Sequence, residues 1–413
     1  MPAHHSLLHD LCQLPHRGAA TPNEREAARL LAEHLRSRGA AVRLEAFSTP
    51  QTYATVVYWI VGMVLAGIGL ALSGGFLVGQ LGLLLGGFAL IQAWLYFNWR
   101  ETLVTRFPEQ HRAVNVVGQW TLPGNVPGES TAPIRRAADQ PVRLHVILMA
   151  HYDTAPISAL YTPKQQKTFR VSLIMSLCVM TLGVVLSAIY TFGGTSSLVF
   201  WALWAVVLYL IGQALLGTMG YWTKGYSNGA SDNATGVVAA IETADRLRKA
   251  SQSGGLSGTL VEVVLPSAEE VGMLGALAYL KKNRDNWPNG GKNTIIINFD
   301  TLGAGKLTVI EQTGTVEVIR YKNALTDLAR QLVGQPAFAQ RSQIGRWHTA
   351  DFDSVWFVRA GLPTLALCAL DADGTMPRIH QPDDTLGLID EQPMHAAVDL
   401  AEAVVRNCYE QFH

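Results

Sequence analysis

Two long stretches of this sequence contain no charged residue. Residues 46–99 form a run of 54 positions without Asp, Glu, Lys or Arg, and residues 171–223 form a second run of 53. A membrane-spanning helix needs about 20 apolar residues, so each run has the length of two helices joined by a turn. Gly- and Ser-rich breaks divide the runs at 73–75 and 193–197. The pattern predicts two helical hairpins, with spans near residues 54–73, 76–97, 171–192 and 198–221.

Aromatic residues support a membrane location for these hairpins. They cluster near the ends of the spans, as they do at the two interfaces of a bilayer; examples are Tyr53, Trp59, Trp94, Trp99 and Trp222. The alternative is a pair of hairpins buried in a large soluble core, but a soluble helix normally keeps charged residues on one face. We therefore expect the lipid bilayer to be a partner of this chain.

Basic residues indicate how the spans are oriented. The two short turns carry none, whereas the opposite ends of the spans are flanked by Arg36, Arg38, Arg43, Arg100, Arg106, Arg112, Lys164, Lys167, Arg170 and Lys224. By the positive-inside rule, the side that carries these residues is cytoplasmic. The sequence thus predicts an integral membrane protein of a bacterial-type inner membrane, with four transmembrane helices and with the soluble part and both termini in the cytoplasm.

Outside the two runs the composition is that of an ordinary soluble domain. The whole chain of 413 residues is 49% hydrophobic and 15% charged, and its 32 Lys and Arg balance its 32 Asp and Glu. This composition excludes intrinsic disorder, and zero net charge gives no reason to expect nucleic acid as a partner. The expected organisation is one soluble domain in three pieces, residues 1–50, 100–170 and 224–413, interrupted by hairpins at 51–99 and 171–223.

Strand-like and helix-like patterns alternate in the soluble pieces. Thr21-Pro22-Asn23-Glu24 is a capping box that opens a helix running to about Arg38. Further helices are predicted at 234–249, 274–283, 317–333 and 392–412, and strands at 42–47, 113–120, 143–150, 259–265, 293–299, 307–311 and 363–369. Such alternation predicts an α/β fold, a three-layer sandwich around a mostly parallel mixed sheet. Residues 121–141, rich in Pro, Gly and Ala, are expected to form a loop.

Several polar residues follow the predicted strands, at the edge where such a sheet places a binding site. With two others from nearby loops they form the set His151, Asp153, Asp232, Glu269, Glu270, Asp300 and His380. Each has an ordinary explanation when taken alone. A histidine after a strand is often structural, Asp232 can be a helix cap, and Glu269 and Glu270 can be a solvated pair. Charges placed directly after a buried strand, however, need something to neutralise them.

Taken together these residues indicate a metal centre. Two histidines and three carboxylates make a mixed nitrogen and oxygen donor set that suits zinc or a similar first-row metal. Two metals need a bridging carboxylate and about two further ligands each, and one Glu then remains as a base. In His151-x-Asp153 an extended backbone places both side chains on one face, so Asp153 can orient the imidazole.

The order of the motifs resembles metallopeptidase family 28. The chain has His-x-Asp, Gly-Ala-x-Asp-Asn-x-x-Gly, Glu-Glu-x-Gly-x-x-Gly, Asn-x-Asp and a late His before Asp-Asp-Thr. That family includes bacterial leucyl aminopeptidases, aminopeptidase Y and glutamate carboxypeptidases. The resemblance runs from about Leu8 to the C-terminus and omits both hairpins, and it implies a zinc-peptidase type of sheet.

The resemblance also implies a role for each residue of the set. His151 and Asp300 resemble the ligands of one zinc ion, Glu270 and His380 resemble those of a second, and Asp232 resembles the carboxylate that bridges the two ions. Glu269 resembles the general base, and Asp153 the residue that orients His151.

Two segments near the C-terminus are less well matched to the family. Asp353 matches the Asp of a Ser-Asp-His segment in the family, but here it lies between Phe352 and Ser354, so a substrate contact is in doubt. Residues 343–348 are interpreted as a solvated loop, with a pocket wall as the alternative.

The expected activity is that of a membrane-anchored di-zinc metallopeptidase, an aminopeptidase that hydrolyses N-terminal residues from peptides at the cytoplasmic membrane surface. Hydrophobic or membrane-associated peptides are the hypothetical substrates, with simple tethering as the alternative. A carboxypeptidase, another amidohydrolase, a glutaminyl cyclase (which typically uses one zinc) and a non-catalytic membrane scaffold remain open. So does homo-oligomerisation.

Overall fold

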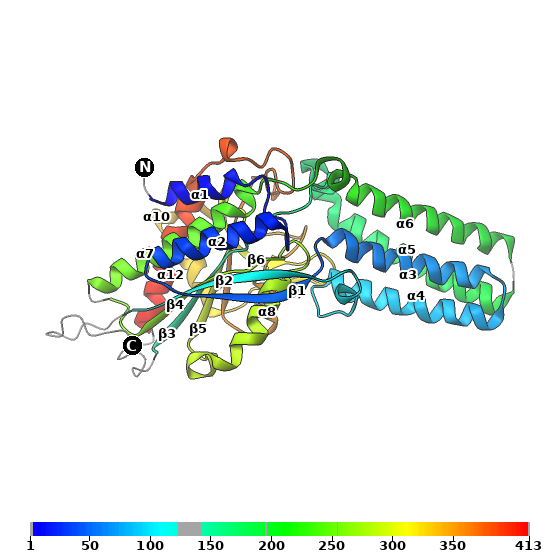
Figure 1. Cartoon of the computed structure of the whole chain (residues 1–413), viewed down its shortest axis with the longest axis horizontal. Coiled ribbons are helices and arrows are strands. Elements are labelled where there is room, and N and C mark those ends of the chain that lie inside the picture. The colour runs from blue at the N-terminus through cyan, green and yellow to red at the C-terminus, as the bar shows by residue number, and fades with distance from the viewer. Residues whose placement is uncertain (1–2, 123–141, 195, 254, 412–413) are drawn as a thin grey trace.

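The computed structural model describes residues 3–122, 142–194, 196–253 and 255–411, and it consists of an α/β domain from which a bundle of long helices projects (Figure 1). Four helices of the described chain are long and apolar enough to cross a membrane: α3 Tyr53–Leu72, α4 Phe76–Phe97, α5 Pro163–Gly193 and α6 Ser197–Lys224. They match the four predicted spans, although α5 begins eight residues earlier than expected. The loop predicted at 121–141 lies almost entirely outside the described residues.

The α/β domain is built on one mixed sheet with the order β1-β2-β4-β3-β5-β9-β6-β7, and β8 pairs with β6 beside this path. Its strands are β1 Ala41–Thr49, β2 His111–Thr121, β3 Leu144–Met149, β4 Thr259–Leu265, β5 Thr294–Phe299, β6 Lys306–Thr313, β7 Ile319–Arg320, β8 Ser342–Arg346 and β9 Thr364–Leu370. The four central strands β4, β3, β5 and β9 are mutually parallel, whereas β1, β2, β6 and β7 pair antiparallel toward the edges. The predicted mixed sheet is confirmed, with its parallel part at the centre.

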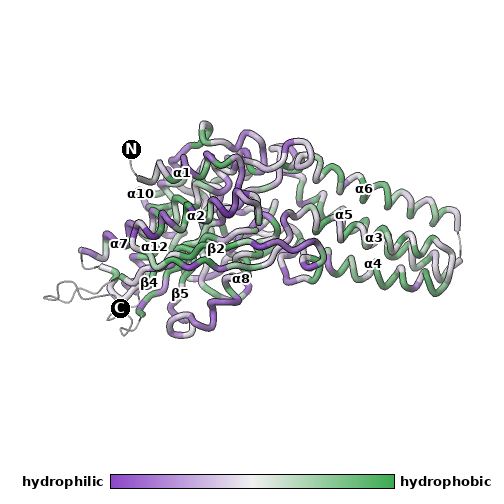
Figure 2. Tube along the Cα trace, in the orientation of Figure 1, coloured by the Kyte–Doolittle hydropathy of each residue, from purple (hydrophilic) through white to green (hydrophobic). Residues whose placement is uncertain are grey.

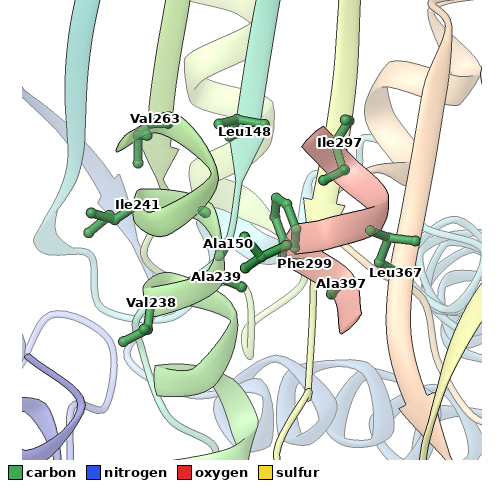
Figure 3. Close-up of a cluster of buried hydrophobic side chains, with 14 of the residues drawn as sticks. Leu148, Ala150, Val238, Ala239, Ile241, Val263, Ile297, Phe299, Leu367 and Ala397 are labelled. Carbon is green, nitrogen blue, oxygen red and sulfur yellow. The ribbon is translucent and has the colours of Figure 1, made fainter. Parts of the chain in front are cut away.

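Helices cover both faces of this sheet, which confirms the three-layer sandwich. One face packs against α1 Ala3–Gln13, α2 Pro22–Ser37, α7 Gly236–Gln252, α9 Ala324–Val333 and α12 Gln392–Gln411. Figure 3 shows Leu148, Ile297 and Leu367 of three neighbouring strands packed in this layer. The other face packs against α8 Leu274–Asn283 and the short α11 Val355–Arg359. The central strands are therefore buried on both sides, which explains their uninterrupted apolar sequences.

Two predicted elements near the C-terminus are wrong. The helix expected over 317–333 begins only at Ala324, because Asn323 caps it by accepting hydrogen bonds from the amides of Leu325 and Thr326. Ile319 and Arg320, which precede the cap, instead form β7. Residues 343–346, expected to be a solvated loop, belong to β8, which pairs in parallel with β6. The short α10 Pro336–Ala339 lies between α9 and β8.

The four long helices pack tightly against one another. Glycines allow the closest approach, because a Cβ added at Gly82 of α4 would lie 2.5 Å from the main-chain oxygen of Gly67 in α3. Hydrophobic residues predominate along the whole length of the four helices (Figure 2), and the bundle exposes large apolar side chains such as Leu84, Trp201 and Leu208. An exposed apolar surface of this extent is typical of a site that contacts a membrane or another protein.

Candidate metal centre

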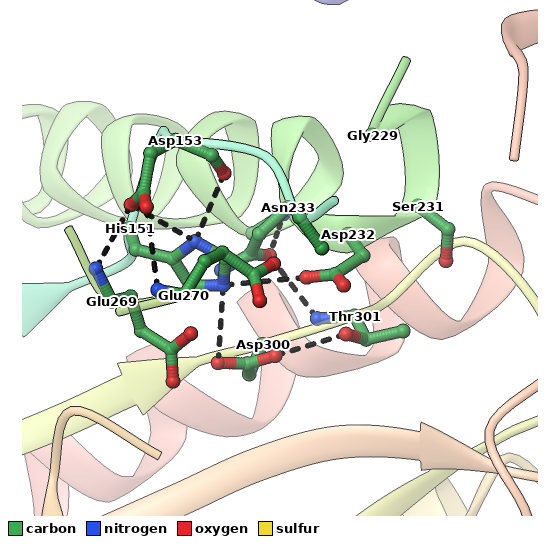
Figure 4. Close-up of polar contacts among 12 residues, drawn as sticks. His151, Asp153, Gly229, Ser231, Asp232, Asn233, Glu269, Glu270, Asp300 and Thr301 are labelled. Carbon is green, nitrogen blue, oxygen red and sulfur yellow. Dashed lines mark hydrogen bonds and ion pairs between the residues drawn. The ribbon is translucent and has the colours of Figure 1, made fainter. Parts of the chain in front are cut away.

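The seven predicted site residues come together at the carboxyl ends of the central strands, and all of them except His380 are labelled in Figure 4. The strands β3, β4 and β5 end just before His151, the turn containing Glu269 and Glu270, and Asp300, respectively. Because parallel neighbours end at one edge of a sheet, their loops bring these side chains into one place. The segment before α7 supplies Asp232, which a cis peptide bond joins to the next residue, and the loop after β9 supplies His380.

Five of these residues form two groups that share Asp232. In the first group, Nε2 of His151 lies 3.3 Å from Oδ1 of Asp232 and 3.6 Å from Oδ2 of Asp300. In the second group, Nε2 of His380 lies 3.0 Å from Oε2 of Glu270 and 3.3 Å from Oδ2 of Asp232. Asp232 thus presents one carboxylate oxygen to each histidine. Each group keeps its ligand atoms within 4.8 Å of one another, which is the arrangement that two adjacent metal ions require.

The buried polar atoms of this cluster fit bound cations. Oδ2 of Asp232 and Oε1 of Glu270 are buried and accept no hydrogen bond from the described residues. Burial raises the pKa of Glu270 to about 7 and also raises that of Asp300, so without cations these carboxylates are costly to keep ionised. Burial alone would lower the pKa of His380, but Glu270 and Asp232 outweigh it and raise the pKa to about 10. The donor chemistry suits zinc.

Asp153 organises the loop that carries the two glutamates. Its carboxylate oxygens accept hydrogen bonds from the main-chain N–H groups of Glu269 (3.1 Å) and Glu270 (3.3 Å). The Nδ1 of His151 lies 3.2 Å from the main-chain oxygen of Asp153 and 3.6 Å from its carboxylate. Asp153 therefore contacts His151, as expected, and in addition fixes the glutamate turn, which the sequence did not indicate.

Two neighbours of Asp232 hold it in place. Asp384 accepts hydrogen bonds from the main-chain N–H groups of Ser231 (2.7 Å) and Asp232 (3.1 Å). The amide of Asn233 donates to the carbonyl of Phe299, and its oxygen accepts from the N–H of Thr301, so this residue ties the Asp232 segment to the end of β5. Both residues belong to the motifs described above, but their positions in the motifs do not indicate these contacts.

A buried arginine was missed altogether. Arg17 is fully buried and donates to the main-chain carbonyls of Tyr152 and Gly229, both at 2.7 Å. It therefore joins the loop of His151 to the loop of Asp232. Only the fold reveals this role, because Arg17 lies more than 100 positions before either loop in the sequence.

Both hairpins contact the centre directly. The ring of Tyr161, just before α5, lies 4.1 Å from the ring of His380 between centroids. At the end of α4, the hydroxyl of Tyr96 donates to the main-chain oxygen of Val271 at 2.7 Å, immediately after Glu270. The hairpins are therefore built into the walls of the site.

A cavity of about 220 Å³ opens onto the centre. The lining includes the acidic residues Asp232, Glu269, Glu270, Asp300 and Asp351, and no described residue of the lining is Lys or Arg. Trp347 and Phe352 also line it, so the alternative of a pocket wall holds for the end of the segment 343–348. Asp353 is fully buried and is absent from the lining among the described residues.

Comparisons with known proteins agree with the predicted resemblance. Residues 216–405, just under half of the chain, match the model of Peptidase family M28, and this match includes five of the seven site residues. No curated protein sequence matches the chain. The resemblance to metallopeptidase family 28 is thus confirmed for residues 216–405, which begin near the end of the second hairpin.

Solved structures show the same fold over nearly the whole chain. A glutaminyl cyclase from Porphyromonas gingivalis is 13% identical with a TM-score of 0.54, and the alignment covers 98% of this chain and 97% of that protein. A zinc aminopeptidase from Bacillus subtilis is 14% identical with a TM-score of 0.52, and the alignment covers 98% of this chain and 94% of that protein. A Zn-dependent exopeptidase from Parabacteroides distasonis is 14% identical with a TM-score of 0.53, and the alignment covers 98% of this chain and 97% of that protein. At these identities the likeness shows the fold.

Proposed function

We propose that this chain, similar as it is to peptidase family M28, is a membrane-inserted di-zinc aminopeptidase. His151 and Asp300 would hold one zinc ion, Glu270 and His380 the other, and Asp232 would bridge them. The two groups of ligand atoms that share Asp232 support this assignment. Other divalent first-row metals fit the same donors.

The charge of the cavity is the observation that favours a free amine as the recognised group. Five acidic side chains line the cavity, and its described lining contains no lysine or arginine. A carboxypeptidase needs a cation to hold the terminal carboxylate of its substrate, and this lining offers none. Asp232, Glu270 and Asp300 are assigned to the zinc ions, and Glu269 is assigned to proton transfer. The acid left to face the N-terminal amine of a peptide is Asp351, whose Oδ2 is buried without a hydrogen bond from the described residues.

Glu269 is suited to move the proton. Its side chain lines the cavity, and it lies outside the two ligand groups that share Asp232, although its carboxylate is within 4.8 Å of ligand atoms of His151 and Glu270. Burial and the neighbouring Glu270 raise its pKa well above the ordinary value, which favours a group that takes up a proton and gives it back. Bound zinc ions would supply a water of lowered pKa and polarise the carbonyl of the substrate. Glu269 would accept the proton of that water and deliver it to the leaving amine.

The test compares three peptides that share the same scissile bond and differ in their termini. The peptide with a free N-terminus and an amidated C-terminus should be hydrolysed, and its N-acetylated counterpart should not. Cleavage of the N-acetylated peptide with a free C-terminus, at equal or higher rate, would contradict the aminopeptidase assignment and favour a carboxypeptidase.

Glutaminyl cyclisation is the second candidate, because cyclases share this fold. The presence of a complete second ligand group argues for two metals and against it. A peptide that begins with glutamine separates the two activities by mass. An aminopeptidase releases free glutamine, whereas a cyclase releases ammonia and leaves the chain intact. A non-catalytic scaffold would yield neither product, and the retained ligand set speaks against it.

The hairpins are proposed to span the membrane. The soluble domain and the hairpin turns lie at opposite ends of the four helices (Figure 1), as the predicted topology requires. Labelling cysteines introduced at Ser73 and at Lys292 with a membrane-impermeant reagent in intact cells tests the orientation. Ser73 should react and Lys292 should not.

A further inference from the structure

The cavity at the metal centre continues between the membrane helices. We infer that α3, α5 and α6 form an apolar extension of the substrate site, and that the substrate is therefore a peptide with apolar residues after its N-terminal residue. This inference rests on the proposed aminopeptidase function and adds the class of substrate. The same cavity that contains Glu269 and His380 is lined by side chains from all three helices.

One face of α5 lines the cavity over more than three turns. The lining residues are Thr168, Phe169, Ser172, Leu173, Ser176, Leu177 and Met180. Their spacing of three, four and five positions places them on a single stripe of the helix. From Thr168 to Met180 this stripe is about 18 Å long, at about 1.5 Å per residue. An extended peptide rises about 3.3 Å per residue, so the stripe has the length of about five residues.

The other two helices complete the walls. Tyr53, Val57 and Val61 of α3 follow one another at intervals of four residues, and Leu210, Ala214 and Gly217 of α6 do so at four and three. The three helices contact one another pairwise. The extension therefore has walls from three helices.

The extension reaches the depth of the proposed bilayer. Arg170 is the last charged residue of α5 before its uncharged run, and its side chain donates to the main-chain oxygen of Thr315 in the soluble domain at 2.7 Å. Met180 lies ten residues further, or about 15 Å into the run. The metal ligands themselves stand on the soluble domain, so a bound chain would have its scissile bond at the surface and its apolar part among the helices.

Polar groups on these walls favour a peptide over an alkyl chain. Ser172, Ser176 and Gln213 line the cavity within the uncharged runs. Ser176 donates to the main-chain oxygen of Ser172, whereas the half-buried amide of Gln213 makes no hydrogen bond to another described residue. A peptide brings N–H and C=O groups that can pair with such an amide, and an alkyl chain leaves it unpaired.

The experiment uses the purified full chain in lipid nanodiscs. Three substrates share the same N-terminal residue and scissile bond: a dipeptide amide, a seven-residue peptide with Gly and Ser after the first two residues, and one with Leu and Val there. We expect kcat/KM for the apolar peptide to exceed that for the polar peptide by at least tenfold. An equal kcat/KM for both peptides overturns the inference.

Substitutions inside the cavity distinguish binding of the peptide in the cavity from partitioning of the peptide into the lipid. Ser176→Trp fills the extension from α5, and Met175→Trp is its matched control, because Met175 is 51% exposed on the outer surface. Ala214→Phe and the exposed Leu215→Phe form a second pair on α6. We expect each cavity variant to lower kcat/KM for the apolar peptide about tenfold, with hydrolysis of the dipeptide amide within twofold of wild type. Each control should resemble wild type with both substrates.

The outcomes distinguish the two proposals. If wild type does not hydrolyse the dipeptide amide, the proposed function fails. If it does, but the cavity variants and their controls act alike on the apolar peptide, only the extension fails. A fatty-acyl amide that is cleaved faster than the apolar peptide would contradict a peptide as the occupant.

Discussion

Two buried clusters of acidic residues lie at opposite ends of β3, and they neutralise their charge in different ways. His145 and His151 stand six residues apart, at the start of β3 and just after its end. At His145, Glu262 pairs with Arg43 at 3.1 Å, accepts a hydrogen bond from Tyr279 at 2.5 Å and contacts the imidazole at 3.3 Å. We call this the closed cluster. We call the group of ligands around His151 the open cluster.

The open cluster lacks partners of this kind. Its carboxylates outnumber its two histidines, and described oxygens of Asp232 and Glu270 remain without hydrogen bonds. In the closed cluster both carboxylate oxygens of Glu262 have protein partners. Burial is nearly complete in both. What distinguishes these two clusters is therefore the presence of a protein donor for each carboxylate oxygen, rather than burial or the presence of histidine.

The largest effect should follow from removing the proposed base of the open cluster. Glu269→Gln keeps the shape of the side chain and removes its ability to accept a proton, so kcat should fall by about 10³-fold or more. Zinc content should stay unchanged, because Glu269 is not among the proposed ligands. Near-normal hydrolysis of the free-amine peptide would show that the base is misassigned.

Loss of the turn that Asp153 holds should have a smaller effect. Asp153→Ala removes the acceptor for the amides of Glu269 and Glu270 and the contact to His151, and we expect kcat/KM or zinc affinity to fall by about 10–100-fold. The matched control is Asp399→Ala. Asp399 pairs with Arg246 of α7 and with Arg341, which follows α10. Equal losses of activity in the two variants would argue against a specific role for Asp153.

The closed cluster should affect stability and leave catalysis intact. Burial would raise the pKa of Glu262, but His145, Tyr279 and Arg43 outweigh it and lower the pKa to about 2 from 4.5. Its contribution to the free energy of unfolding, about 3 kcal/mol, is therefore complete above about pH 4.5 and is lost as the pH falls toward 2. Glu262→Gln should lower Tm at pH 7, with kcat/KM within about twofold of wild type.

The pH dependence is best measured on metal-free protein, so that the open cluster does not interfere. The difference in Tm between wild type and Glu262→Gln should shrink between pH 4.5 and pH 2. A difference that stays constant with pH would mean that the charge of Glu262 does not stabilise the fold.

The smallest effect should come from removing a contact between the first hairpin and the turn that carries the two glutamates of the site. Tyr96→Phe removes one hydrogen bond to the turn that follows Glu270, which is worth about 0.5–1.5 kcal/mol, or about two- to tenfold in kcat/KM. Tyr58→Phe removes a hydroxyl contact between α3 and α6 that does not touch this turn, and serves as control. Identical kinetics in the two variants would show that α4 does not position the glutamates.

The open cluster could be predicted from the sequence because its members lie at recognisable positions in the local sequence pattern. His151, Glu269 and Asp300 each follow an apolar strand, and the ends of parallel strands must meet. The four long apolar helices could be located because two long runs of the sequence contain no charged residue. The start of α5 was placed too late, since Lys164, Lys167 and Arg170 interrupt the apolar pattern while the helix continues through them.

The remaining contacts depend on packing between distant segments. Arg17 reaches loops that begin 135 residues later, and Tyr96 reaches Val271. No spacing rule links such residues in a single sequence. The closed cluster was not predicted either, because Glu262 lies within an apolar strand and its partners come from β1, β3 and α8. The strand β8 was missed because its polar residues resemble a loop, and only pairing with β6 stabilises it.

The metal content of the purified chain tests the central claim most directly. After equilibration with zinc and removal of free metal, the wild type should contain about two zinc ions per molecule. Asp232→Asn, which lacks the charge to bridge two ions, should contain one or none, and Glu262→Gln should still contain two. Wild type with no bound zinc, or an unchanged content of two in Asp232→Asn, would contradict the account.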